Sequence, residues 1–261
     1  PGAGGRMVSV PGALETSPGT LGTFGRAWAV EVRKVAATPS LVVGLAIGIA
    51  ATPLAALVVA DRSDAAESMS AVRLAVSAAI IPLVVFALWG AYATTSEYER
   101  GAIVGSLLAV PRRSSFYAAK LTAVAAVAGV AMTLSAAAAV LAVGLAAPPP
   151  GLAVGPGWAV PVIGLIVGAV TAVGAAVGFV LRGAITTSAA LLIALLGPSV
   201  LGSALGGAQR WASGAGPAAL IAHAAGSDRP ELGAAAGTLV FTVVVVVVGA
   251  VGWRVFARAD H

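Results

Sequence analysis

The sequence predicts an all-α integral membrane protein with six transmembrane helices, and three observations support this. Of the 261 residues, 59% are hydrophobic and only 10% are charged, whereas soluble domains carry roughly 25% charged residues. The mean hydropathy is +1.00, and a soluble domain could not cover its surface with so few polar groups. Apolar runs recur six times, each with about the 20 residues that an α-helix needs to cross a bilayer.

The expected spans are residues 41–60, 72–94, 117–146, 158–181, 185–205 and 232–255. The third is longer than a bilayer requires, so we expect it to tilt or to project beyond the membrane. Pro198 follows a glycine and predicts a kink in the fifth. Together the spans form one transmembrane domain over residues 22–258, with a flexible N-terminus at 1–21 and a C-terminal tail at 259–261.

The centres of the expected spans contain small residues but no Asp, Glu, Lys, Arg or His. Intramembrane ionisable groups mark proton relays and ion paths, so their absence argues against a proton-driven carrier. It also argues against an intramembrane hydrolase, because a nucleophile needs a base beside it. In the fourth span, Gly164 and Gly168 share one helix face and Gly174 and Gly178 share another, which predicts close packing against neighbouring helices.

Several kinds of site are missing from the sequence. Cysteine is absent, which excludes disulfides, thiolate metal sites and cysteine nucleophiles. The chain has two histidines, His223 and His261, too few for a histidine metal cluster. Neither lysine follows a glycine, so there is no phosphate-binding P-loop. We expect no catalytic residue and no metal or cofactor site in this chain.

The positions of Lys and Arg predict the orientation in the membrane. With the N-terminus inside, eleven of them fall on the expected inside segments and four on the outside segments, as the positive-inside rule requires. An even number of spans then returns the C-terminus to the cytoplasm. Because the basic residues are scattered and form no stripe, the net charge of +5 does not indicate nucleic-acid binding.

Residues 22–38 are expected to form an amphipathic interfacial helix ahead of the first span. Trp28, Val32 and Val35 recur at helical spacing and supply an apolar face. The basic side is formed by Arg26, Arg33 and Lys34. The alternative is a frayed basic tail that only sets the orientation.

The connection at residues 96–120, between the second and third spans, combines charged residues with a short apolar face. The apolar residues follow an i, i+1, i+4, i+5 pattern typical of one face of a helix, and they are Ile103, Val104, Leu107 and Leu108. Pro111 ends this helix. The charged residues are Glu97, Glu99, Arg100, Arg112, Arg113 and Lys120. The alternative is a solvated loop whose charges only set topology.

This connection resembles the corresponding loop in the six-span permease subunits of type-2 ABC exporters, the ABC-2 family. The matching positions are Glu97, Glu99-Arg100-Gly101-Ala102-Ile103, Leu107-Leu108, Pro111-Arg112-Arg113 and Lys120. Ala102 departs from the threonine that is common there. More loosely, the resemblance extends over residues 22–258, through the helix before the first span, the six spans and a long external stretch before the last.

The resemblance implies a cytoplasmic coupling helix that docks on a separate ATPase subunit. Ile103, Leu107 and Leu108 would then pack in a groove of that partner, and Glu97, Glu99 and Arg100 would orient the helix through ion pairs at its rim. It implies two ATPase subunits, which would bind ATP and Mg, and a second permease that is identical or homologous. The resemblance also implies a location in the plasma (inner) membrane of a bacterium. Membrane lipid is then a further partner.

The stretch at residues 202–232 resembles the re-entrant external segment of the same family. It contains Trp211, which suits an aromatic belt at the outer surface, together with Pro217 and His223. Its apolar part is too short to span a membrane. We expect His223 to be an interfacial polar residue, because no second histidine or cysteine accompanies it.

These features predict the pathway-forming subunit of an ATP-driven exporter. Its uncharged spans suit an amphipathic or hydrophobic substrate, such as a natural product, a peptide or a lipid-like molecule. The alternative is a membrane scaffold or sensor that transports nothing and binds a soluble partner through the same loop. A proton-driven carrier ranks third and a membrane enzyme fourth.

Overall fold

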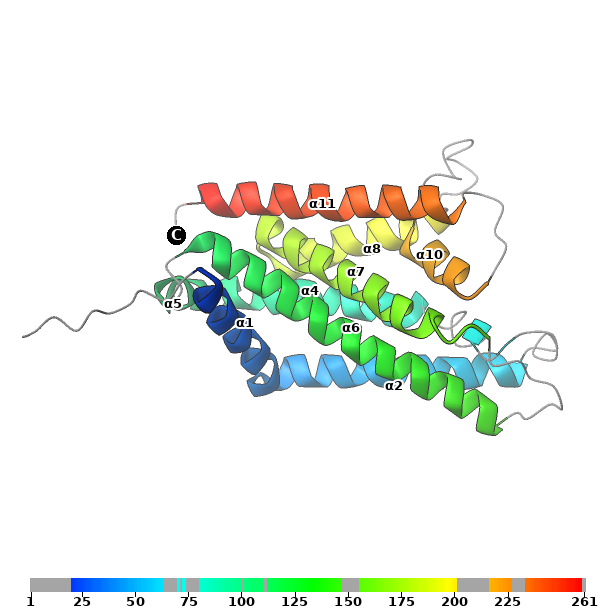
Figure 1. The fold of residues 1–261 in the computed structure, drawn as a ribbon. Helices are drawn as coiled ribbons and strands as arrows, with labels where there is room; N and C mark the ends of the chain where they lie inside the picture. Colours follow the sequence, from blue (N-terminus) through cyan, green and yellow to red (C-terminus); the bar gives the residue numbers. More distant parts are fainter. Residues whose placement is uncertain are drawn as a thin grey trace, which may run out of the picture.

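The computed structural model of the chain describes residues 20–62, 70, 72–73, 80–99, 101–109, 112–146, 155–200, 216–226 and 233–259. These residues contain helices and no strand, which confirms the all-α prediction (Figure 1). The helices are α1 (Thr20–Ala37), α2 (Pro39–Arg62), α4 (Ile80–Glu99), α5 (Ala102–Ala109), α6 (Arg113–Ala146), α7 (Ala159–Leu181), α8 (Ala184–Val200), α10 (Pro217–Ala224) and α11 (Ala234–Arg258).

Four of these helices have the length and composition of membrane spans. They are α2, α6, α7 and α11, each of at least 23 residues, and α8 is a shorter apolar helix. The chain is therefore built as a multi-pass membrane protein. The expected count of six spans stays a prediction, although α4 and α8 lie in the same bundle (Figure 1).

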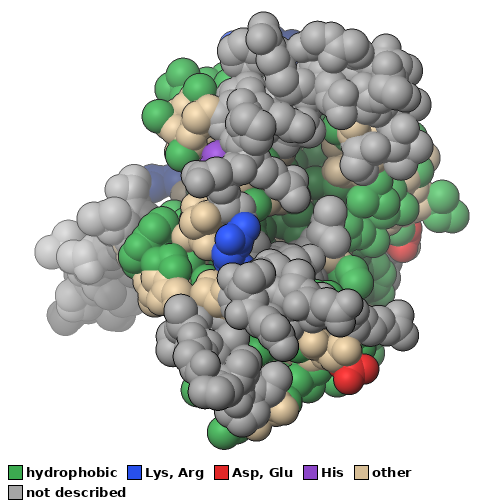
Figure 2. All heavy atoms as spheres, turned by 90° about the vertical axis from the view of Figure 1, so that its right-hand side faces the viewer, with side chains coloured by type: hydrophobic (Ala, Val, Ile, Leu, Met, Phe, Trp, Pro, Cys, Tyr) green, Lys and Arg blue, Asp and Glu red, His purple; other side chains and the backbone are tan. Residues whose placement is uncertain are grey.

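The long helices run between two ends of the bundle, which we name after the short helices found there (Figure 1). The α5 end holds α5, the last turns of α4 and α11 and the first turns of α6. The α10 end holds α10, the first turns of α7 and α11 and the last turns of α6. Figure 2 faces the α10 end, where the described side chains are mostly hydrophobic and few are charged.

Helix α7 lies at the centre of the bundle, and small residues let its neighbours approach closely. A Cβ atom on Gly168 would lie 2.6 Å from the carbonyl oxygen of Ala125 in α6, and one on Gly174 would clash with the carbonyl oxygen of Ala87 in α4. Gly164 likewise faces α6. The two small-residue faces predicted for this span are thus confirmed, and each faces a different helix.

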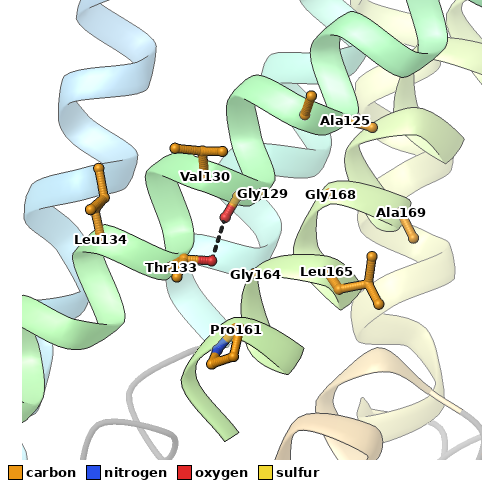
Figure 3. Close-up of a pocket in the computed structure, with 11 residues that line it drawn as sticks. Ala125, Gly129, Val130, Thr133, Leu134, Pro161, Gly164, Leu165, Gly168 and Ala169 are labelled. Carbon is orange, nitrogen blue, oxygen red and sulfur yellow. Dashed lines mark hydrogen bonds between the residues drawn. The ribbon is translucent and has the colours of Figure 1, made fainter. Parts of the chain in front are cut away.

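The same small residues leave a groove on the surface between α6 and α7, a cavity of about 560 Å³ (Figure 3). Its floor is glycine and alanine, and its rim includes Val130, Leu134 and Leu165. The one hydroxyl in it, on Thr133, donates a 2.8 Å hydrogen bond to the carbonyl oxygen of Gly129. The groove is therefore apolar and offers no free polar group.

Helix α1 is an ordered helix packed against the bundle, so the alternative of a frayed tail is wrong. Ala27, Glu31 and Val35 are all buried, and their four-residue spacing places them on one face of α1. Arg26 and Arg33 are exposed, and Trp28 is half-buried. Lys34 does not share the exposed side with the two arginines, because its ammonium group points to acidic residues within the bundle.

Candidate functional site

Four charged side chains from three helices meet at the α5 end. The ammonium group of Lys120 in α6 lies 2.8 Å from Glu31 Oε2 of α1 and 2.6 Å from Glu97 Oε1 of α4. The ammonium group of Lys34 in α1 lies 2.7 Å from Glu31 Oε1 and 3.1 Å from Glu97 Oε1. Each cation thus contacts both carboxylates. We call Glu31, Lys34, Glu97 and Lys120 the four-charge cluster.

The four-charge cluster is largely shielded from solvent. The side chains of Glu31 and Lys120 are each 4% exposed and that of Glu97 is 12% exposed, whereas Lys34 is half-buried. An uncompensated charge at such a position would be strongly destabilising. Here two ammonium groups and two carboxylates alternate, so the charges of the four side chains sum to zero. The cluster therefore joins α1, α4 and α6 through charges that compensate one another.

The pKa values of two cluster members reflect this balance. Burial by itself would lower the pKa of Lys34, but the carboxylates of Glu97 and Glu31 outweigh it and hold that pKa above its ordinary value. Burial would raise the pKa of Glu97, but the ammonium groups of Lys120 and Lys34 outweigh it and hold that pKa below its ordinary value. Both groups therefore carry their charge at neutral pH.

Helix α5 is connected to this cluster. Lys34 Nζ donates a hydrogen bond of 3.0 Å to Ser106 Oγ of α5. The cluster also borders a cavity of about 250 Å³, to which α1, α4, α5 and α6 all contribute residues. The short helix predicted ahead of Pro111 is thus in direct contact with the helix predicted ahead of the first span.

A tight turn leads from α4 into α5. Gly101 has a φ of +65°, a left-handed conformation that glycine adopts without strain. Its amide donates a 3.1 Å hydrogen bond to the carbonyl oxygen of Tyr98. The predicted site residues Arg100 and Pro111, and the side chain of Leu107, lie outside the described residues.

The two faces of α5 have different surroundings. Ile103 is buried against aromatic side chains of the same chain, so the expectation that it packs in a partner's groove is wrong. Val104 is exposed, and Leu108 is the more exposed at 80%. The one-residue offset between Ile103 and Val104 turns their side chains about 100° apart on a helix of 3.6 residues per turn.

The aromatic residues that share a buried cluster with Ile103 form a second junction at the α5 end, which we call the aromatic cluster. Its members are Phe116 and Tyr117 of α6, Phe179 of α7 and Phe256 of α11. The ring centroids of Phe179 and Phe256 are 4.9 Å apart, and those of Tyr117 and Phe179 are also 4.9 Å apart, within the range of favourable aromatic pairs. The cluster joins α5 to α6, α7 and α11.

Two residues of the loop that resembles the ABC-2 coupling segment contact the ends of the chain's own helices. Arg113 Nη1 donates hydrogen bonds to the carbonyl oxygens of Ala257, at 3.2 Å, and Ala259, at 2.8 Å, where α11 ends. Glu99 Oε1 accepts a 3.2 Å hydrogen bond from the amide of Ala184, where α8 begins. A cation at a helix C-terminus and an anion at an N-terminus both oppose the helix dipole favourably.

Glu97 is a further correction, because it was expected to form ion pairs at the rim of the partner's groove. Its carboxylate instead lies within the four-charge cluster. Arg112 is exposed beside the start of α6. Among the described loop residues that were matched to the family, Glu99, Leu108 and Arg112 are exposed.

Sequence reasoning overlooked Glu31. A signal was present, because Glu31 lies four residues from both Ala27 and Val35, on the face of α1 that is otherwise apolar. A lone acidic residue on such a face requires a basic partner. Those partners include Lys120, which is 89 positions away in the sequence and is not identifiable from spacing.

The structure places two of the three residues that were expected in the external segment. Pro217 begins α10, at the first helical position that proline favours. His223 is in the last turn of α10, beside an apolar cavity between α7, α10 and α11. Trp211 lies outside the described residues.

A scan against protein-family models and searches of curated proteins and of solved structures found no match. The functional conclusion therefore depends on the α5 end itself. The contacts described there connect helices to one another. A short helix exposes Val104 and Leu108 on one side and is held on the other by the Ser106–Lys34 hydrogen bond and by the packing of Ile103 in the aromatic cluster.

Proposed function

We propose that the chain is the transmembrane subunit of an ATP-driven exporter of the ABC-2 type, and that α5 is its coupling helix. The observation that supports this best is the two-sided environment of α5. Ile103 anchors the helix to the aromatic cluster, while Leu108, 80% exposed, is available for a groove in another protein. A large apolar side chain at the polar end of a membrane bundle suits a docking contact better than a solvated loop.

The topology that fits this role places the α5 end in the cytoplasm. Helices α4 and α8 would complete six spans together with α2, α6, α7 and α11, and both termini would be cytoplasmic. The excess of Lys and Arg on these segments supports that orientation. The membrane would be the plasma membrane of a bacterium.

The contacts at the α5 end suggest how force would spread from an ATPase. A displacement of α5 would act on α1 through the Ser106–Lys34 hydrogen bond and on α4 and α6 through the four-charge cluster. It would act on α7 and α11 through Ile103 and the aromatic cluster. Packed elements of this kind move as units, so one docking event would reorient several spans together.

The exported substrate would be amphipathic or hydrophobic. The complete exporter would contain two ATPase subunits, which bind ATP and Mg, and two permeases, either identical or homologous. The uncharged spans support a pathway without ion-binding groups.

Substitution of Leu108 tests the docking role. We expect Leu108→Asp to abolish co-purification of a P-loop ATPase from native membranes and to remove ATPase stimulation in vesicles, because the charge would be buried in the partner's groove. Leu145→Asp is the matched control, since Leu145 is also an exposed leucine but lies at the far end of α6. ATPase binding that survives Leu108→Asp would refute the coupling role. A reproducible partner that is not an ATPase would support the scaffold or sensor instead.

A further inference from the structure

An elongated cavity of about 420 Å³ lies between α7, α10 and α11 at the α10 end. This volume is within the roughly 300–1,000 Å³ typical of small-molecule sites. We call this cavity the lateral slot. Its lining includes Trp158, Leu165 and Ala169 from the α7 side, His223 from α10, and Phe241 and Val245 from α11.

The lateral slot follows the direction of the helices. Both α7 and α11 begin at the α10 end (Figure 1), and the slot is lined from Trp158 to Ala169 on one side and from Ala234 to Val245 on the other. At 1.5 Å per helical residue this is a length of about 16 Å. The slot is therefore a groove that extends along the expected membrane normal.

The polarity of the slot changes with depth. Its mouth carries the indole of Trp158 and the imidazole of His223, both groups that favour a membrane–water interface. Two hydroxyls lie along α11, but Thr238 and Thr242 donate 2.8 Å hydrogen bonds to the carbonyl oxygens of Ala234 and Thr238. The deep part is lined by hydrocarbon side chains.

The environment of the slot limits what can fill it. Most of the surface of α11 is exposed, so in a membrane the slot is bordered by lipid. Water is a poor occupant, because it needs two to four polar partners that the deep part does not offer. An empty slot is also unfavourable, because its lining would lose dispersion contacts. A flexible, unbranched hydrocarbon chain attached to a polar group matches both the shape and the change in polarity.

We propose that the lateral slot binds one acyl chain of a membrane phospholipid. The glycerol and headgroup lie beside Trp158 and His223, and the methyl end of the chain lies near Ala169 and Val245. The bound chain fills the space between α10 and α11. This site depends on insertion of the protein in a bilayer. It is independent of whether α5 docks on an ATPase.

Photo-crosslinking in vesicles tests the proposal. The protein is reconstituted in phosphatidylcholine vesicles that contain phosphatidylcholine with a diazirine either near the carboxyl end or near the methyl end of one acyl chain. After illumination, adducts are located by mass spectrometry. We expect the first probe to label residues near Trp158 and the second to label residues near Ala169 and Val245. Labelling in the slot should be several-fold denser than on Leu141, an exposed leucine of α6 outside the slot lining.

A variant that fills the slot gives the matched comparison. Thr242→Trp places a large side chain in the slot, whereas Val247→Trp places it on an exposed part of α11 outside the lining. We expect a several-fold loss of slot labelling in Thr242→Trp only, with labelling of Leu141 unchanged in both. Thr238→Phe narrows the slot from the same helix and replaces Thr242→Trp if that variant does not assemble.

Four results would overturn the assignment. The first is labelling of the slot no denser than that of Leu141. The second is slot labelling that is the same in Thr242→Trp and Val247→Trp, since this would come from bulk lipid. The third is the reversed depth order of the two probes. Labelling by a free diazirine fatty acid without labelling by the phospholipid probes would also exclude a phospholipid and would favour a single-chain amphiphile.

Discussion

Glu31 illustrates how one buried side chain can determine the arrangement of several helices. Its two carboxylate oxygens contact different cations, Lys34 through Oε1 and Lys120 through Oε2. Removing its charge would leave two ammonium groups to share the carboxylate of Glu97. The excess positive charge would then be buried between α1 and α6.

We expect Glu31→Gln to lower the free energy of unfolding in detergent micelles by about 3 kcal/mol, the usual cost of breaking a buried ion pair. Asp61→Asn is the control, because Asp61 is exposed and should change stability by less than about 0.5 kcal/mol. The double variant Glu31→Gln/Lys120→Gln should recover part of the loss, because it restores neutrality around the remaining pair. Equal stability of Glu31→Gln and the wild type would contradict the four-charge cluster.

At the scale of the helices, close approach depends on positions where even one methyl group does not fit. Gly168 is such a position, since its Cβ would lie 2.6 Å from a backbone oxygen of α6. Gly144, near the end of α6, is a helical glycine with open space around it. The two glycines therefore allow the same substitution to be compared in opposite environments.

We expect Gly168→Ala to destabilise the protein by about 1–3 kcal/mol, the usual range for overpacking. Gly144→Ala should be neutral or stabilising by up to about 0.5–1 kcal/mol, because alanine is the better helix former. Thermal unfolding of both variants in the same detergent measures the difference. If the two substitutions had the same effect, α6 and α7 would not pack through their small residues.

Much of the helical architecture was predictable from the sequence, because an apolar run of span length is a local property. The order and approximate bounds of α2, α6, α7 and α11 follow from it, and those of α1 and α5 follow from the helical spacing of their apolar residues. The two faces of α7 also followed from the spacing of its glycines. The end of α4 and the beginning of α6 extend beyond the expected spans, since polar residues at a helix end continue the helix without being apolar.

The site was predictable only in part, because its contacts join residues far apart in the sequence. The connection around α5 was identified, but its outward and inward faces were not distinguished. Ile103 and Leu108 are both large apolar residues on the same short helix, and their spacing does not say which one meets the core. The pairing of Glu97 with Lys34 joins residues 63 positions apart, for which the sequence offers many alternative partners.

At the scale of the whole molecule, the orientation in the membrane can be tested directly, because the chain has no cysteine. We expect Arg258→Cys, at the α5 end, to react with a membrane-impermeant maleimide only after cells are permeabilised. Gly157→Cys, at the α10 end, should react in intact cells. Both positions are exposed, so accessibility reports the side of the membrane. Labelling of Arg258→Cys in intact cells would reverse the proposed topology.

The neutrality of the four-charge cluster has a consequence for energetics in an energised membrane. A group that carries one net elementary charge across the full potential exchanges about 2.3 kcal/mol of electrical work per 100 mV. Because two cations and two anions are held together here, their joint displacement transfers no net charge. The membrane voltage therefore neither drives nor opposes a displacement of the cluster itself.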